Sequence, residues 1–186
     1  MIIGLTGPNA AGKGEVAAYL ATRGFAYHSL SDVLREELDR RGIPPTRENL
    51  IAVGNELRAT SGFGVLAEMI LPRLGRRDVV DSIRNRSEVE VLRALPGFTL
   101  LGVNAPIEVR FARARARNRP GDGMTLGEFQ AKEARENSPD PSRQQLALTF
   151  ALADHTVSNE GTLADLHRRV DEFLTTRPPG GSAGVS

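Results

Sequence analysis

The sequence of 186 residues is long enough to bury the core of one α/β domain with small inserts. Its 24 basic and 23 acidic residues nearly cancel, so the charge balance does not favour binding to nucleic acid or to an anionic membrane. The absence of cysteine excludes disulfides and thiolate metal sites, and no apolar stretch approaches the roughly 18 residues of a membrane span. We expect no signal peptide, and hence a cytoplasmic location.

Strands and helices alternate in the predicted secondary structure. In chain order, we expect a strand at 2–6, a helix at 13–20, a strand at 25–29, helices at 32–41, 46–60 and 63–74, strands at 79–83 and 98–103, helices after Pro106 and around 129–136, and a strand at 155–158. Three capping boxes predict further helix starts, at Ser87 with Glu90, Thr125 with Glu128, and Thr162 with Asp165. This order predicts a parallel sheet covered by helices on both faces. We expect a single domain over 1–177 and a flexible tail over the Pro-, Gly- and Ser-rich residues 178–186.

The first loop carries the most specific motif. Residues 7–13 read Gly-Pro-Asn-Ala-Ala-Gly-Lys, which matches G-x-x-x-x-G-K between a predicted strand and a predicted helix. Glycines let successive backbone N–H groups point at phosphate oxygens, and the helix N-terminus adds positive dipole. Lys13 can then reach the β- and γ-phosphates of ATP. Only Lys13 and Lys132 of the 24 basic residues are lysine, which draws attention to both.

The residues after Lys13 depart from the full motif, which has Ser or Thr as a magnesium ligand where this chain has Gly14. The Gly-Lys-Gly run resembles the nucleoside monophosphate kinases related to adenylate kinase, and little-characterised archaeal nucleotide kinases share Gly-Lys-Gly-Glu. The resemblance implies a three-layer P-loop kinase fold with a five-stranded parallel sheet, a helical acceptor-binding insert at about 31–75 and a lid at about 119–141. It also implies Mg²⁺ that enters with ATP and is held mainly by phosphates and water. Glu15, where the family usually has Thr, either helps to hold magnesium or points into solvent.

Two segments resemble the acceptor side of adenylate kinase. Ser-Asp-Val-Leu-Arg at 31–35 resembles the family's Gly-Asp-x-Leu-Arg, which implies that Arg35 binds the acceptor phosphate and that Asp32 orders water on magnesium. Asp81 ends an apolar strand, the usual place of a magnesium-organising carboxylate, and Arg84 is a second clamp in a turn one residue shorter than the family's. The alternatives are an ordinary exposed helix for Asp32 and Arg35, and a strand-end turn for Asp81.

Further cations follow the fourth predicted strand. Adenylate kinases carry arginines seven and eleven residues after the proline that matches Pro106, and Arg113 and Arg117 have these spacings. In the predicted lid, Lys132 and Arg135 are three residues apart and share a helix face. The resemblance implies that they meet the transferring phosphoryl group.

A last loop, at 153–161, resembles the adenine-side loop of dephospho-coenzyme A kinases and of the archaeal group, which implies that Asn159 and Gly161 lie under the adenine. The predicted ATP-binding residues are thus Gly7, Asn9, Ala10, Ala11, Gly12, Lys13, Gly14, Glu15, Arg113, Asn159 and Gly161.

The sequence lacks the guanine signature N-K-x-D, which disfavours a GTPase. The leading hypothesis is a kinase that binds ATP and a small nucleotide, as a monomer or homodimer, and phosphorylates a nucleoside or deoxynucleoside monophosphate. The predicted catalytic residues are Lys13, Arg84, Arg117, Lys132 and Arg135; Asp32, Arg35 and Arg84 are predicted to bind the acceptor, and Asp81 and Asp32 to hold the metal through water. The alternatives are a kinase similar to dephospho-coenzyme A kinase and a regulatory module that binds ATP without turnover.

Overall fold

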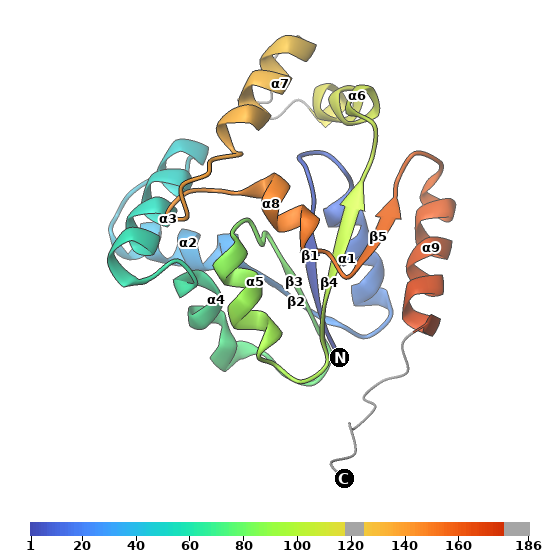
Figure 1. Ribbon diagram of the computed structural model, residues 1–186, viewed down its shortest axis with the longest axis horizontal. Coiled ribbons are helices and arrows are strands. Elements are labelled where there is room, and N and C mark those ends of the chain that lie inside the picture. Colours follow the sequence, from blue (N-terminus) through green and yellow to red (C-terminus); the bar gives the residue numbers. More distant parts are fainter. Residues whose placement is uncertain (118–124, 177–186) are drawn as a thin grey trace.

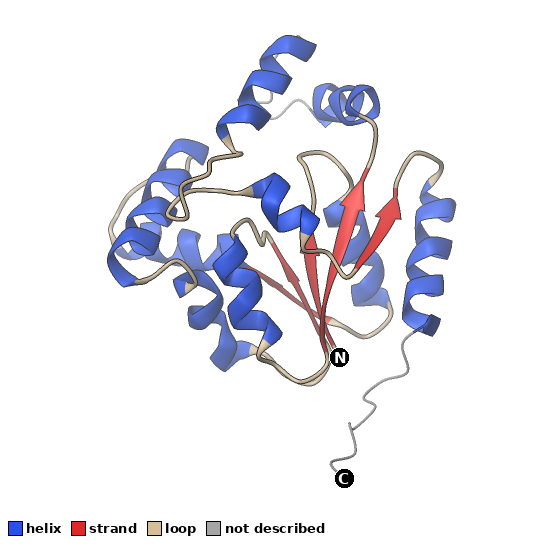
Figure 2. Cartoon of the chain, in the orientation of Figure 1, coloured by secondary structure: helices blue, strands red, loops and turns tan. Residues whose placement is uncertain are grey.

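The computed structural model describes residues 1–117 and 125–176, which form a layered α/β structure (Figures 1 and 2). In chain order, its elements are β1 (Ile2–Thr6), α1 (Lys13–Thr22), β2 (Ala26–Ser29), α2 (Leu30–Arg40), α3 (Arg47–Ser61), α4 (Val65–Ile70), the 3-10 turn η1 (Leu71–Arg73), β3 (Asp78–Asp81), α5 (Arg86–Arg93), β4 (Phe98–Asn104), α6 (Ile107–Arg117), α7 (Leu126–Arg135), α8 (Leu146–Ala151), β5 (His155–Ser158) and α9 (Leu163–Thr176). Residues 119–124 of the predicted lid and the predicted tail at 178–186 lie outside the described residues.

The strands form a five-stranded sheet in the order β2-β3-β1-β4-β5, and its strand pairings are parallel. β1 is central, with Ile3 opposite Val79 on β3 and Thr99 on β4. Parallel neighbours need crossover connections, which helices supply here. This confirms the predicted parallel α/β sheet, and it places the loop after β1 in the middle of the edge where the strands end.

Helices cover both faces of the sheet, as Figures 1 and 2 show. Alternate side chains of a strand point to opposite faces, so Ile2 packs with α2, α3, α4 and α5, whereas Ile3 packs with α1 and α9. Val80 and Val79 divide between the two faces in the same way. The two hydrophobic cores hold the sheet rigid and fix where its carboxyl ends lie.

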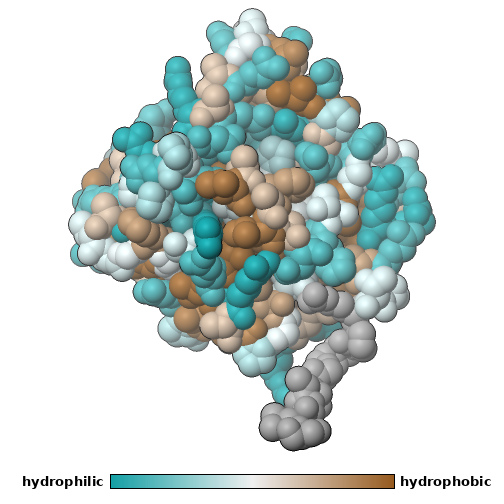
Figure 3. Space-filling view, viewed as in Figure 1, coloured by the Kyte–Doolittle hydropathy of each residue, from teal (hydrophilic) through white to brown (hydrophobic). Residues whose placement is uncertain are grey.

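The outer surface is mainly hydrophilic on the face that Figure 3 shows, with hydrophobic side chains gathered near its centre over α5 and α8. Leu148 of α8 is among the exposed large hydrophobic residues. Among the described residues, no helix is long and apolar enough to cross a membrane.

The third strand ends earlier than predicted. β3 stops at Asp81 because Ser82 adopts a φ of 66°, a left-handed conformation that breaks the ladder and that non-glycine residues rarely adopt. Pairing with β2 also stops at Asp81, opposite Ser29. The chain therefore turns sharply after this carboxylate, and the following residues leave the sheet at the edge where β1 ends.

One predicted helix start was wrong. Ser87 does not cap α5; the cap is Asn85, whose side chain accepts from the Ser87 N–H at 2.8 Å, while Glu88 reaches back to the Asn85 N–H at 3.1 Å. The other two predicted starts are confirmed by hydroxyl–amide bonds between Thr125 and Glu128 and between Thr162 and Asp165. The side-chain nitrogen of the buried Asn85 donates to the carbonyls of residues 141 and 143, which orients its oxygen toward the Ser87 N–H.

The cap gives a direct test. Asn85→Ala should lower the free energy of unfolding by about 2 kcal/mol or more, because it removes a helix cap and leaves two distant carbonyls without their donor. Ser87→Ala, two residues away, should lower it by less than about 0.5 kcal/mol. Urea unfolding of both variants measures the difference, and equal effects would contradict the cap assignment.

Candidate functional site

The phosphate loop connects β1 to α1 and depends on two glycines. Gly7 has a φ of 137° and Gly12 a φ of 106°, which side chains disfavour. A Cβ at Gly7 would also overlap the Val103 carbonyl of β4, and one at Gly12 would overlap the Asn159 amide. The loop therefore curls tightly between β4 and the loop after β5, and its backbone follows the path that the motif predicts.

Lys13 begins α1 and folds back over this loop. Its ammonium donates to the Gly7 carbonyl at 2.7 Å and to the Pro8 carbonyl at 3.0 Å. Burial lowers the pKa of Lys13 to about 8; the nearby Arg84 guanidinium adds to this effect and the Asp81 carboxylate opposes it. A bound phosphate would place a negative charge beside this half-buried ammonium and stabilise its protonated form.

A cavity of about 850 Å³, here called the P-loop cavity, opens over the loop. It brings together predicted residues that are far apart in sequence: Ala10, Gly12, Lys13, Gly14, Glu15, Arg35, Asp81, Arg84, Arg113, Arg117, Asn159 and Gly161. Glu15 is exposed on the first turn of α1. Ala11 is buried beneath the loop, and Asn9 turns away to a carboxylate that follows α7.

Asn159 and Arg113 form one wall of the P-loop cavity. The Asn159 amide donates to the Ala11 carbonyl at 2.8 Å, and its oxygen accepts from Arg113 Nη2 at 3.3 Å. Arg113 Nη1 is buried and has no hydrogen-bond partner among the described residues. Buried donors in proteins are nearly always paired, so this nitrogen is an exception in the described part of the chain.

Asp81 is the carboxylate best placed for a metal. One of its oxygens accepts from the Ser82 N–H at 2.6 Å, and the other has a contact of 3.5 Å with the Tyr27 hydroxyl. Asp32, in contrast, is paired with Arg35 at 2.6 Å and lines neither the P-loop cavity nor the cavity beside it. In the described part of the chain, no three His, Cys, Asp or Glu side chains cluster as a metal site.

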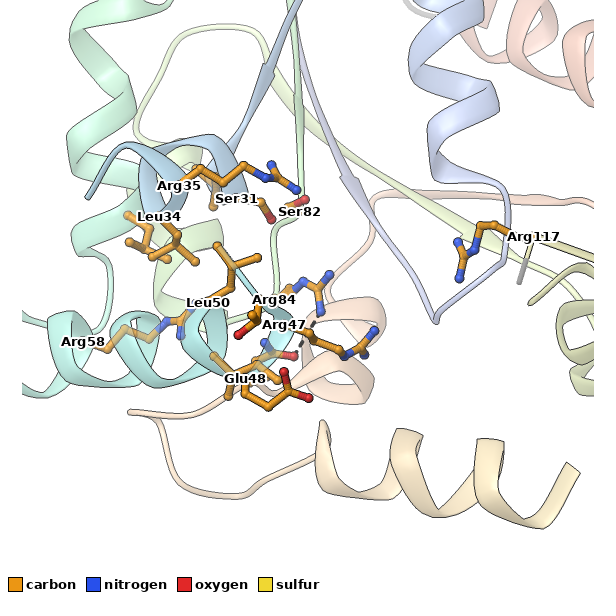
Figure 4. A pocket seen from close by; sticks show the side chains of 15 residues that line it. Ser31, Leu34, Arg35, Arg47, Glu48, Leu50, Arg58, Ser82, Arg84 and Arg117 are labelled. Atoms are coloured by element: carbon orange, nitrogen blue, oxygen red, sulfur yellow. Dashed lines mark hydrogen bonds between the residues drawn. The ribbon is translucent and has the colours of Figure 1, made fainter. Parts of the chain in front are cut away.

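A second cavity of about 580 Å³, the α2–α3 cavity, lies between α2 and α3 (Figure 4). Leu34 and Leu50 provide apolar walls, and the cavity shares Arg35, Arg84 and Arg117 with the P-loop cavity. Arg47 also lines it and is not among the residues predicted from the sequence. The only local signal was its place directly after the Thr46 cap, which is common to many surface residues.

The cations predicted for the lid lie elsewhere. Lys132 and Arg135 line a third cavity of about 610 Å³ between α3 and α7, and neither lines the P-loop cavity. The side chains of this segment that face the phosphate loop are acids: Glu133 pairs with Arg110, and Glu136 accepts from Asn9. The catalytic role of Lys132 and Arg135 stays a prediction.

Comparisons with solved structures identify the fold. TT1252 from Thermus thermophilus matches with a TM-score of 0.64 at 24% identity, over 95% of this chain and 97% of that one. A shikimate kinase from Bacteroides thetaiotaomicron matches with a TM-score of 0.61 at 18% identity, over 94% and 98%. The chain therefore shares the α/β fold of these two structures.

Sequence comparison identifies the family. No family model matches the chain. A UPF0200 protein of Methanoculleus marisnigri is 31% identical over 178 residues, which cover 93% of this chain and 94% of that protein. The chain belongs to the UPF0200 family.

The pKa of Lys13 predicts how ATP binding depends on pH. Phosphate binds the charged ammonium, so binding must raise a pKa that is about 8 in the free protein. ATP affinity should be constant below about pH 8 and fall by up to about tenfold per pH unit above it. Calorimetric titration of ATP with Mg²⁺ across this range measures the slope. Lys13→Ala should bind weakly with no such slope, and a flat profile in the wild-type protein would contradict a role for the ammonium.

Proposed function

We propose that this protein is an ATP-dependent kinase that phosphorylates a nucleoside or deoxynucleoside monophosphate. One observation carries the proposal: the P-loop cavity and the α2–α3 cavity meet at Arg35, Arg84 and Arg117. Phosphoryl transfer is mainly a matter of positioning two phosphates in line and neutralising their charge. A shared cationic wall between two cavities is suited to that task.

On the donor side, the phosphate loop and Lys13 would bind the phosphates of ATP, and Arg113 and Asn159 would contact the rest of the nucleotide. Asp81 fits a metal held through water, because one carboxylate oxygen has only the 3.5 Å contact with Tyr27 among the described residues. Mg²⁺ bound with ATP would neutralise charge on the phosphates. The protein's own part is to hold the phosphates still and to turn them toward Arg84.

On the acceptor side, Arg35 and Arg84 would grip the acceptor phosphate, and Leu34 and Leu50 would pack against its base. The volume of about 580 Å³ lies in the range of small-molecule sites and is open to the P-loop cavity at the arginine end. Burial lowers the pKa of Arg84, and the neighbouring Arg47 adds to this effect. An anion bound in this cavity would raise the pKa of Arg84, because its negative charge would oppose the effects of burial and of Arg47.

A panel of acceptors tests the proposal. ATP turnover is followed with nucleoside monophosphates, deoxynucleoside monophosphates, dephospho-coenzyme A and no acceptor, with Lys13→Ala as the inactive control. Acceptor-dependent ADP release with a monophosphate supports the proposal. Release with a hydroxyl acceptor alone would identify a different kinase, and ATP binding without release would identify a regulatory module.

The two sides of the site can be separated by substitution. Arg35→Ala and Arg84→Ala should raise the acceptor KM by roughly 10- to 150-fold, because each removes a charge-assisted hydrogen bond worth about 1.5–3 kcal/mol. The Kd for ATP should move little. Arg40→Ala is the matched control, since Arg40 lies on the same helix but is exposed and paired with Glu37. Loss of ATP affinity with an unchanged acceptor KM would mean that the two sites are reversed.

A further inference from the structure

The Glu136 carboxylate, directly after α7, is bound by groups from three distant segments. Asn9 of the phosphate loop donates to Oε2 at 2.6 Å, and Arg47 of α3 donates to Oε1. Arg84, after β3, donates through its Nη1 to Gln144 Oε1 at 3.1 Å, and the same nitrogen lies 3.9 Å from Oε2 as a longer ion pair. Glu136 is only 5% exposed, so this is a buried carboxylate that pairs with two arginines.

The arrangement of the two arginines is that of an oxyanion site. Both guanidinium groups line the α2–α3 cavity, and Figure 4 shows them lying near each other. Each pairs with a different oxygen of the same carboxylate, as two arginines pair with separate oxygens of a phosphate. Both guanidinium groups thus present donors to one shared oxyanion, which is the geometry that a bound phosphate group also requires.

The position of Glu136 is fixed by the backbone. The segment that follows it folds back and is held on the turn that carries Arg84: the Gln145 N–H donates to the Arg84 carbonyl at 2.7 Å. The Asn85 amide donates to the Arg143 carbonyl at 3.0 Å, one residue further along the same turn. The carboxylate is therefore held beside the cationic pair by the fold itself, and it does not reach there by a free swing of an exposed side chain.

Of the three cavities, Glu136 lines the one between α3 and α7, which it shares with Arg47. It contacts Asn9 on the donor side and Arg47 and Arg84 on the acceptor side. A phosphate that entered between the two arginines would meet the same nitrogens and would have to displace this carboxylate. A neutral acceptor group could not do so, because it would leave both arginines with less negative charge than before.

We propose that Arg47 and Arg84 form a binding site for a phosphate or similar tetrahedral oxyanion, and that Glu136 fills this site until the acceptor's phosphate displaces it. The inference rests on the proposed function and deepens it in two ways. It adds Arg47 to the groups that bind the acceptor, and it makes a negatively charged acceptor the only kind that can open the site.

Inorganic phosphate is the probe, titrated by calorimetry in the Lys13→Ala background so that binding at the phosphate loop is weakened and equal in all the variants compared. In that background, Glu136→Gln should bind phosphate at least tenfold more tightly, because the neutral amide no longer competes for the arginines. Glu37→Gln is the matched control: Glu37 also pairs with two arginines, Arg40 and Arg41, but lines none of the three cavities, and its loss should not change phosphate affinity. Adding Arg47→Ala to Glu136→Gln should abolish the gain.

Glu136→Asp is the second variant if Glu136→Gln does not fold, since its shorter side chain withdraws the charge from the arginines and should also tighten phosphate binding. Unchanged or weaker phosphate binding in a folded variant would overturn the inference and leave Glu136 a structural residue. The titration needs no turnover, so its result is separate from that of the acceptor panel. A gain in phosphate affinity together with an inactive acceptor panel would support the oxyanion site and contradict the kinase proposal.

Discussion

Several cations are partly or fully buried at the edge of the sheet where the strands end. The need to pair these buried charges is the constraint on which the rest of the site depends. The cations are Lys13, Arg84, Arg110 and Arg113. Removing such groups from water is costly unless they are paired, and a chain without its phosphates must supply the pairing itself. Carbonyls of the phosphate loop accept from Lys13. Glu133 pairs with Arg110, and Glu136 lies 3.9 Å from Arg84. Arg113 keeps one buried nitrogen without a partner among the described residues.

This constraint also explains the irregular backbone at the same edge. The left-handed Ser82 turns the chain out of β3 so that Arg84 faces the cavity, and the buried Asn85 holds the returning segment against that turn. Strained residues persist only where their surroundings determine them, and Ser82 is held by a hydrogen bond from the Ser29 hydroxyl and by its own N–H bond to Asp81. The α7 segment and the acceptor-side turn are thus one mechanical unit, although more than 50 residues separate them along the chain.

The fold alone leaves the acceptor open. A chain named for its action on shikimate shares the fold at 18% identity, and unrelated substrates are common on one fold. The acceptor must therefore be argued from the side chains that line the α2–α3 cavity. Arginines at the end that meets the P-loop cavity and leucines on the walls favour an acceptor with an anionic end and an apolar body.

The sequence by itself determined the phosphate loop, two of the three capping boxes, and the order of strands and helices except for α8, which was not predicted. These features are local: a strand, a helix cap or a glycine loop is specified by residues within a few positions of one another, so periodicity and motif spacing show them. It also pointed to Arg35, Arg84 and Arg113, which line the cavities, while their roles stay predictions. Only the tertiary structure decided that Asn85 displaces Ser87 as a cap, since Asn85 is selected by carbonyls 56 and 58 residues away. The same holds for the contact between Glu136 and Arg47, 89 residues apart, because a pairing across such a distance depends on how the sheet brings the two segments together, and no local pattern encodes it.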